Sequence, residues 1–102
     1  MDIEFWRNKI DAIDERLVEL LNERCRCALE IGKIKRIRRI ALYQPDREAQ
    51  VLRHVLQMNQ GPLADDAVQR LFERIIDESR RAERVTMDLE ESSVRPENSK
   101  GE

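Results

Sequence analysis

The chain has 102 residues, of which 39% are charged and 40% hydrophobic, and it carries a net charge of −2. This length suits one small domain, and four aromatic residues among so many charged ones are typical of a helical protein rather than a β-sandwich. The charge offers no overall attraction to nucleic acid or to an anionic membrane, and no apolar run is long enough to span a membrane. Because the N-terminus MDIEFWRNK also lacks the apolar core of a secretory signal, a cytoplasmic location is expected.

The first predicted helix runs from about residue 2 to about residue 38, with Asp2 as its N-cap. Its apolar positions recur at helical spacing and form one continuous stripe. The stripe contains Ile3, Trp6, Ile10, Ile13, Leu17 and Leu20 or Leu21. About 35 helical residues would be ~50 Å long, whereas a compact chain of this size has a radius of gyration of only about 13 Å. Such a helix requires a partner, and the simplest partner is a second copy of the chain.

Two shorter helices are predicted after a break near residues 39–44. Pro45 suits the first turn of the second helix, which ends near residues 59–61. The third helix is expected over about 64–86, where the apolar periodicity fades. Residues 1–86 are therefore expected to form one helical domain, and residues 87–102 a polar, disordered tail.

Two cations lie on the inner face of the first helix. This face continues the apolar stripe and consists of Arg24, Ala28, Ile31 and Lys35. Burying an unpaired charge is very costly. The sequence therefore leaves two interpretations, in which the cations either pair with Glu48 or Glu83 or face a polar pocket for an anionic ligand. Arg24 and Lys35 are ~16 Å apart along the helix, which lets long side chains grip opposite ends of one small molecule.

Four stretches of the chain resemble one known family. They are WRNKIDAIDERLVELLNER, EIGKIK, PDRE and LFERIIDESRRAE. Together they resemble the all-helical chorismate mutases from residue 5 to about residue 85. The resemblance implies an all-α chain of one very long and two shorter helices, which forms an intertwined homodimeric bundle with active sites shared between subunits. It also implies conversion of chorismate to prephenate, the branch step towards phenylalanine and tyrosine, by a pericyclic rearrangement that needs no nucleophile, metal or cofactor.

The resemblance also assigns roles to the residues expected at the two ends of chorismate, a dianion. Arg24 and Arg7 of the partner subunit are expected to bind its carboxylates, and Lys35 a carboxylate and the ether oxygen. Gln44 stands where relatives often have aspartate, which leaves its contact with the ring hydroxyl less defined. Glu83 stands where relatives have glutamine or glutamate. Since a carboxylate would repel the oxyanion that grows there, Glu83 must be protonated, which burial favours and nearby Lys35 opposes.

The remaining expected site residues surround the ring. By the same resemblance, Glu48 accepts a hydrogen bond from the ring hydroxyl, and Arg47 supports the site electrostatically. Ser79 is expected to contact the substrate near the ring carboxylate. Ile31 and Ile76 match apolar positions that wall the ring.

Other interpretations stay open at this point. An isochorismate pyruvate lyase resembles this family in fold and uses a similar set of cations. A non-catalytic, regulatory dimerisation bundle would pair its inward charges with each other. The basic run KIKRIRR at residues 33–39 is better explained as a solvated helix end near the pocket mouth than as a nucleic-acid patch, because the chain is acidic overall. Cys25 and Cys27 point in different directions on a helix and are expected to be ordinary reduced side chains.

Overall fold

Three helices make up the computed structural model, which describes the backbone of residues 2–100 and the side chains of residues 2–90. They are α1 (Ile3–Arg38), α2 (Pro45–Met58) and α3 (Asp65–Lys100). Residues 2–100 contain no strand, so the predicted all-α class is confirmed. None of the described helices has an apolar stretch long enough to cross a membrane.

Both ends of α1 are closed by local hydrogen bonds. Asp2 is its N-cap, as predicted, and the Oδ1 atom accepts a bond of 3.0 Å from the backbone N–H of Phe5. At the other end Arg39 takes the left-handed conformation, with φ of 58°. The N–H groups of Arg39 and Ile40 then donate to the carbonyls of Arg36 and Lys35, at 3.2 and 2.7 Å. These two bonds form a Schellman motif, which ends α1 at Arg38, one turn after Lys35.

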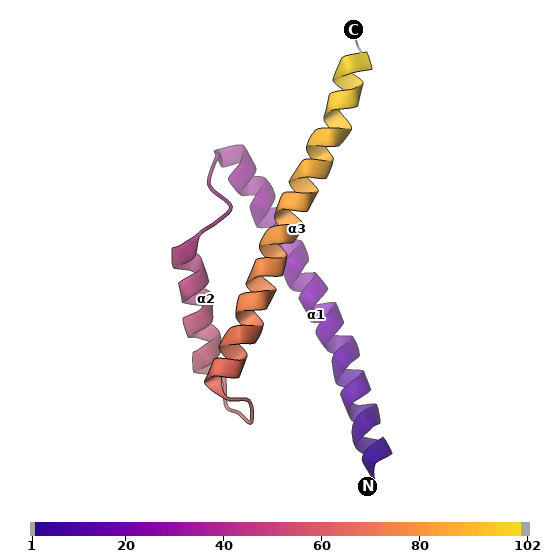
Figure 1. The fold of residues 1–102 in the computed structure, drawn as a ribbon, viewed down its shortest axis with the longest axis vertical. Coiled ribbons are helices and arrows are strands. Elements are labelled where there is room, and N and C mark those ends of the chain that lie inside the picture. The colour runs from indigo at the N-terminus through magenta and orange to yellow at the C-terminus, as the bar shows by residue number, and fades with distance from the viewer. Residues whose placement is uncertain (1, 101–102) are drawn as a thin grey trace.

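The second helix begins at Pro45, as predicted, and ends at Met58. Its connection to α3 is held by Asn59, whose Nδ2 donates to the Leu63 carbonyl at 2.9 Å and to Asp65 Oδ1 at 2.8 Å. These bonds place the first turn of α3 close to the last turn of α2. The two helices are therefore antiparallel neighbours, as Figure 1 shows.

The third helix is longer than the sequence indicated. The predicted end of this helix near residue 86 is wrong, because the backbone stays helical to Lys100. The apolar pattern does fade there, but Glu90 accepts a bond of 2.6 Å from Arg36 of α1, which supports the added turns. The division into a domain of residues 1–86 and a tail of residues 87–102 stays a prediction. Of that tail, the side chains of residues 91–100 and all of residues 101–102 lie outside the described part.

The single chain is flat and has little core. α3 packs against both α1 and α2, and α1 and α3 cross (Figure 1). The chain measures 69 × 33 × 15 Å and its radius of gyration is 18.7 Å, well above the ~13 Å of a compact chain of this size. Among the described residues the only large hydrophobic side chain that is buried is Val68. The predicted stripe of α1 is exposed at Ile3, Trp6, Ile10, Ile13, Leu17, Leu20 and Leu21. So many exposed apolar side chains on one helix are unusual for a protein that stays a monomer in water.

Candidate active site

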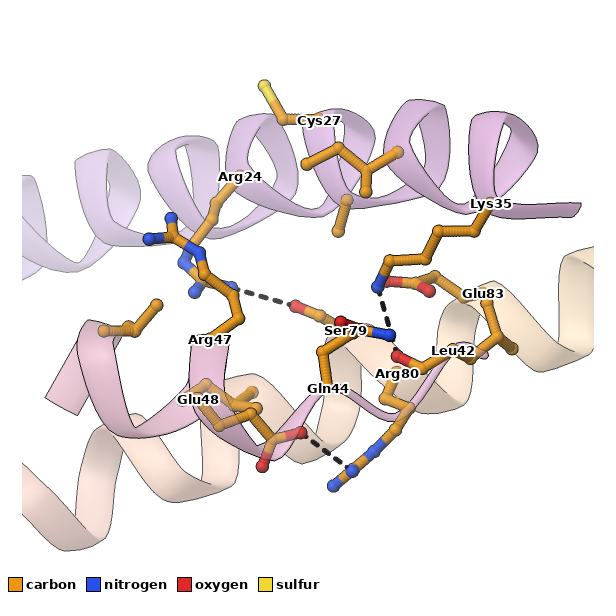
Figure 2. Close-up of a pocket in the computed structure, with 14 residues that line it drawn as sticks. Arg24, Cys27, Lys35, Leu42, Gln44, Arg47, Glu48, Ser79, Arg80 and Glu83 are labelled. Atoms are coloured by element: carbon orange, nitrogen blue, oxygen red, sulfur yellow. Dashed lines mark hydrogen bonds and ion pairs between the residues drawn. The ribbon is translucent and has the colours of Figure 1, made fainter. Parts of the chain in front are cut away.

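A cavity of about 470 Å³ lies between the three helices (Figure 2). Its walls are Arg24, Cys27, Ala28, Ile31, Lys35, Leu42, Gln44, Arg47, Glu48, Val51, Ile76, Ser79, Arg80 and Glu83. Every residue predicted for the site is among them except Arg7. The volume falls within the ~300–1,000 Å³ usual for small-molecule sites.

The two inward cations of α1 reach into this cavity from its opposite ends, as Figure 2 shows. Arg24 Nη1 donates to Ser79 Oγ at 3.2 Å, and Lys35 Nζ donates to the carbonyl of Leu42 at 3.1 Å. Within the described residues, neither cation has a carboxylate oxygen within 4.0 Å. The alternative in which these charges neutralise Glu48 or Glu83 through ion pairs does not occur. Their hydrogen-bond partners here are neutral oxygens, although the charge of Lys35 also acts on Glu83 from beyond ion-pair distance.

The second helix contributes a different set of groups. Glu48 Oε2 accepts a bond of 2.8 Å from Arg80 Nη1 of α3. Arg47 Nη1 donates to Gln50 Oε1 at 2.7 Å, and Gln44 Nε2 donates at 3.0 Å to a backbone carbonyl of the preceding loop. These residues meet at the cavity because Pro45 starts the helix and places them all within its first turn or directly before it.

Glu83 is the buried carboxyl of the site. Its residue is only 8% exposed, and Oε2 has no hydrogen-bond partner among the described residues. Burial raises the pKa of Glu83, while the positive charges of Lys35 and Arg80 oppose that rise. Glu83 therefore keeps its proton to a higher pH than an ordinary glutamate does.

Gly32 explains how Glu83 becomes buried. A Cβ atom at Gly32 would lie 3.2 Å from Glu83 Cγ and 3.4 Å from Glu83 Oε2. The carboxyl therefore lies directly against the bare backbone of α1. Sequence analysis did not single out Gly32, because nothing in the spacing of α1 shows which side chain of another helix approaches it.

Arg80 is a second residue that sequence analysis missed. It pairs with Glu48 and also with Asp77, at 2.7 Å, and its Cζ lies 4.9 Å from the centre of the Tyr43 ring. One signal was present in the sequence, since Arg80 stands three residues before Glu83 and side chains at that spacing are neighbours on a helix. Leu42 and Val51 were also missed as cavity walls.

Arg7 does not join this cavity, and the cysteines contribute no reactive group to it. Arg7 lies in the exposed half of α1 and pairs with Glu4 at 3.1 Å, so it does not reach the site of its own chain. The thiols of Cys25 and Cys27 are free, and in Figure 2 the Cys27 sulfur points away from the other labelled groups. Within the described part of the chain, no cluster of histidine, cysteine or acidic side chains is suited to holding a metal.

These features define a class: an all-helical protein whose bundle holds a small polar site with unpaired cations at both ends. The family model described as "Chorismate mutase type II" matches residues 6–84. The chain belongs to this family.

Individual relatives agree. The bifunctional chorismate mutase/prephenate dehydratase of Stutzerimonas stutzeri is 40% identical over 75 residues, covering 69% of this chain and 20% of that protein. The protein of the same name from Neisseria gonorrhoeae is 45% identical over 78 residues, covering 76% of this chain and 21% of that one. The chain thus spans about a fifth of the length of these relatives.

A solved structure matches over most of its length. The chorismate mutase (form II) of Thermus thermophilus superposes with a TM-score of 0.79 and 30% identity, covering 80% of this chain and 93% of that one. The similarity therefore includes nearly all of that chorismate mutase and is not confined to one helix.

Proposed function

We propose that this protein is a chorismate mutase, an isomerase that converts chorismate to prephenate. The observation that carries the proposal is the pair of cations, Arg24 and Lys35, that face one cavity without a carboxylate partner among the described residues. Chorismate is a dianion, and it would supply the missing negative charges. The family of the chain and the size of the cavity support the same substrate.

The proposed mechanism is positioning and electrostatic stabilisation. The enolpyruvyl arm must fold over the ring before bonds exchange, and fixed cations at two ends of a pocket hold that folded form and remove much of the orientational cost. C–O cleavage runs ahead of C–C formation, so negative charge grows on the ether oxygen. Lys35 and a protonated Glu83 would donate to that oxygen, where preorganised donors contribute most.

The other proposed substrate contacts come from residues that line the same cavity. Arg24 would bind a carboxylate, with Ser79 beside it. Glu48 would accept from the ring hydroxyl, next to Gln44 and Arg47. Ile31 and Ile76 would wall the ring, and no cofactor or metal takes part in the proposed reaction.

The working form is proposed to be a homodimer. The exposed stripe of α1 offers the apolar surface for it, and ~25 Å separate Arg7 from Arg24 along the helix. Arg7 of the partner subunit would then complete the cation set from across an antiparallel contact. We also propose a cytoplasmic location, which suits free thiols at Cys25 and Cys27.

The direct test is incubation with chorismate, with its absorbance followed and the product identified. We expect prephenate. A parallel incubation with isochorismate tests the lyase alternative. The proposal would be contradicted if isochorismate released pyruvate while chorismate gave no prephenate. Absence of turnover with both substrates would favour a non-catalytic bundle.

Glu83→Gln is expected to change the pH dependence of the reaction. In the wild type, activity should fall as pH rises through the Glu83 pKa, which burial has raised, because the carboxylate form repels the growing oxyanion. Glutamine donates at every pH, so the variant should keep its activity where the wild type loses it. kcat measured across pH checks this, and an identical profile in both proteins would contradict a protonated Glu83.

Gly32→Ala is expected to lower kcat several-fold without loss of stability. The added methyl group pushes on Glu83 at 3.2 Å, and displacement of a reacting group by a fraction of an ångström is enough to slow a reaction. Alanine is a better helix former than glycine by ~1 kcal/mol, which offsets the cost of crowding Glu83. Steady-state kinetics and thermal unfolding check both parts, with Lys33→Ala as the control at an exposed neighbouring position. Unchanged kcat in Gly32→Ala would show that the close approach does not matter.

A further inference from the structure

Arg80 lines the cavity together with Glu48 and Glu83 and is itself tightly held. Its side chain is 20% exposed, and its Nη1 pairs with Glu48 Oε2 at 2.8 Å across the α2–α3 contact. Its Nη2 pairs with Asp77 Oδ1 at 2.7 Å, and the guanidinium lies over the Tyr43 ring. Three partners from α2, α3 and the loop before α2 therefore define one orientation of this planar group.

The ion pair also orients Glu48. Only Oε2 is bonded to Arg80, and Glu48 Oε1 takes part in no hydrogen bond within the described residues. The carboxylate thus has one oxygen anchored to α3 and one left to accept a bond at the cavity wall. Without Arg80, this carboxylate on the first turn of α2 would rotate freely and would leave the site with an unpaired negative charge near a dianionic substrate.

We propose that Arg80 is a positioning residue of this active site, which anchors Glu48 through its ion pair and places a positive charge at the cavity that Glu83 also lines. The inference rests on the proposed function and extends it to a residue that need not touch the substrate. Two separable properties follow: the geometry of Glu48 depends on the guanidinium fork, whereas the effect on Glu83 depends on charge alone.

The effect on Glu83 has a defined sign. The charged groups that act on Glu83 are Lys35 from α1 and Arg80 from α3, and both lower the pKa that burial raises. Lys33, Arg36 and Glu90 line a small pocket next to Glu83, where Arg36 pairs with Glu90 and Lys33 with Glu30. Removing the Arg80 charge should therefore raise the Glu83 pKa further and extend activity to higher pH.

Three variants separate these properties: Arg80→Met, Arg80→Lys and the matched control Arg81→Met, which removes an exposed arginine one position along. Arg80→Met is expected to raise KM for chorismate roughly tenfold, because Glu48 loses its charged anchor, and to move the alkaline fall of kcat to higher pH. Arg80→Lys is expected to raise KM but to leave the alkaline fall near its wild-type position. Arg81→Met should change neither.

A double-mutant cycle and a titration complete the test. In a Glu48→Gln background, Arg80→Met should no longer raise KM, because both changes remove the same ion pair. The Glu83 carboxyl can also be titrated by NMR without substrate in the wild type, Arg80→Met and Arg81→Met. Arg80→Met results equal to those of Arg81→Met in KM, pH profile and titration would overturn the inference. Failure of the proposed function is distinct, since the wild type would then form no prephenate while the titration still reports on Arg80.

Discussion

Replacing Lys35 by alanine should lower kcat/KM for chorismate by about 10²–10³-fold or more, the range measured when a donor to a developing oxyanion is removed. Lys35 Nζ lies at one end of the cavity, where it donates to the Leu42 carbonyl and has no carboxylate within ion-pair distance among the described residues. A substrate anion would therefore be its charged partner. The loss should appear mainly in kcat, since the ether oxygen gains most of its charge in the transition state.

The matched control for this experiment is Lys33→Ala. Lys33 lies two residues earlier on the same helix, points to solvent and pairs only with Glu30 within the described part, at 3.4 Å. Lys33 carries the same charge as Lys35, and its replacement by alanine removes the same number of atoms. The two variants therefore differ only in the face of α1 that they alter. Equal kinetics for Lys33→Ala and Lys35→Ala would show that the cavity is not the site of reaction.

Mixing two inactive variants should restore activity if the site is shared between subunits. Arg7→Ala and Arg24→Ala are each expected to be nearly inactive. When equal amounts are refolded together, half of the dimers combine one chain of each kind, and each of these has one intact site, so about a quarter of the wild-type activity should return. The reason is geometric: Arg7 pairs with Glu4 far along α1 from the cavity of its own chain.

The control mixture combines Arg24→Ala with Lys35→Ala. Both residues line the cavity of the same chain, so no combination of the two variants contains an intact site and no activity should return. A mixture of Arg7→Ala with Arg24→Ala that stays as inactive as its components would contradict the shared site. Activity of Arg7→Ala alone near that of the wild type would do the same.

Local signals were sufficient to predict most of the helix boundaries. Asp2 and Pro45 act on the turn that directly follows them, so their effect can be read from a few neighbouring residues. The end of α3 was predicted wrongly because no local signal decides it. The helix formers Met87, Leu89 and Glu90 follow the point where the apolar pattern fades, and the ion pair of Glu90 with Arg36 of α1 joins residues that are 54 positions apart.

The candidate site, too, could be predicted from the sequence only in part. Periodicity placed Arg24 and Lys35 on an inner face, and their spacing along one helix left an anion site as one of two interpretations before any fold was known. Whether they pair with Glu48 and Glu83 could not be predicted, because that depends on how α2 and α3 approach α1. The tertiary structure decides that they do not form ion pairs, and it directs Glu48 to Arg80 instead.

By itself the sequence determined the all-helical class, the faces of the helices and the two cations on the inner face of the first helix, because helical spacing is a property of one segment. Only the tertiary structure decided that Glu83 lies against Gly32 and that Arg80 of α3 pairs with Glu48 of α2. These depend on the crossing of α1 with α3 and on the packing of α2, in which a few tenths of an ångström separate a contact from a clash. No spacing within a single helix contains that information.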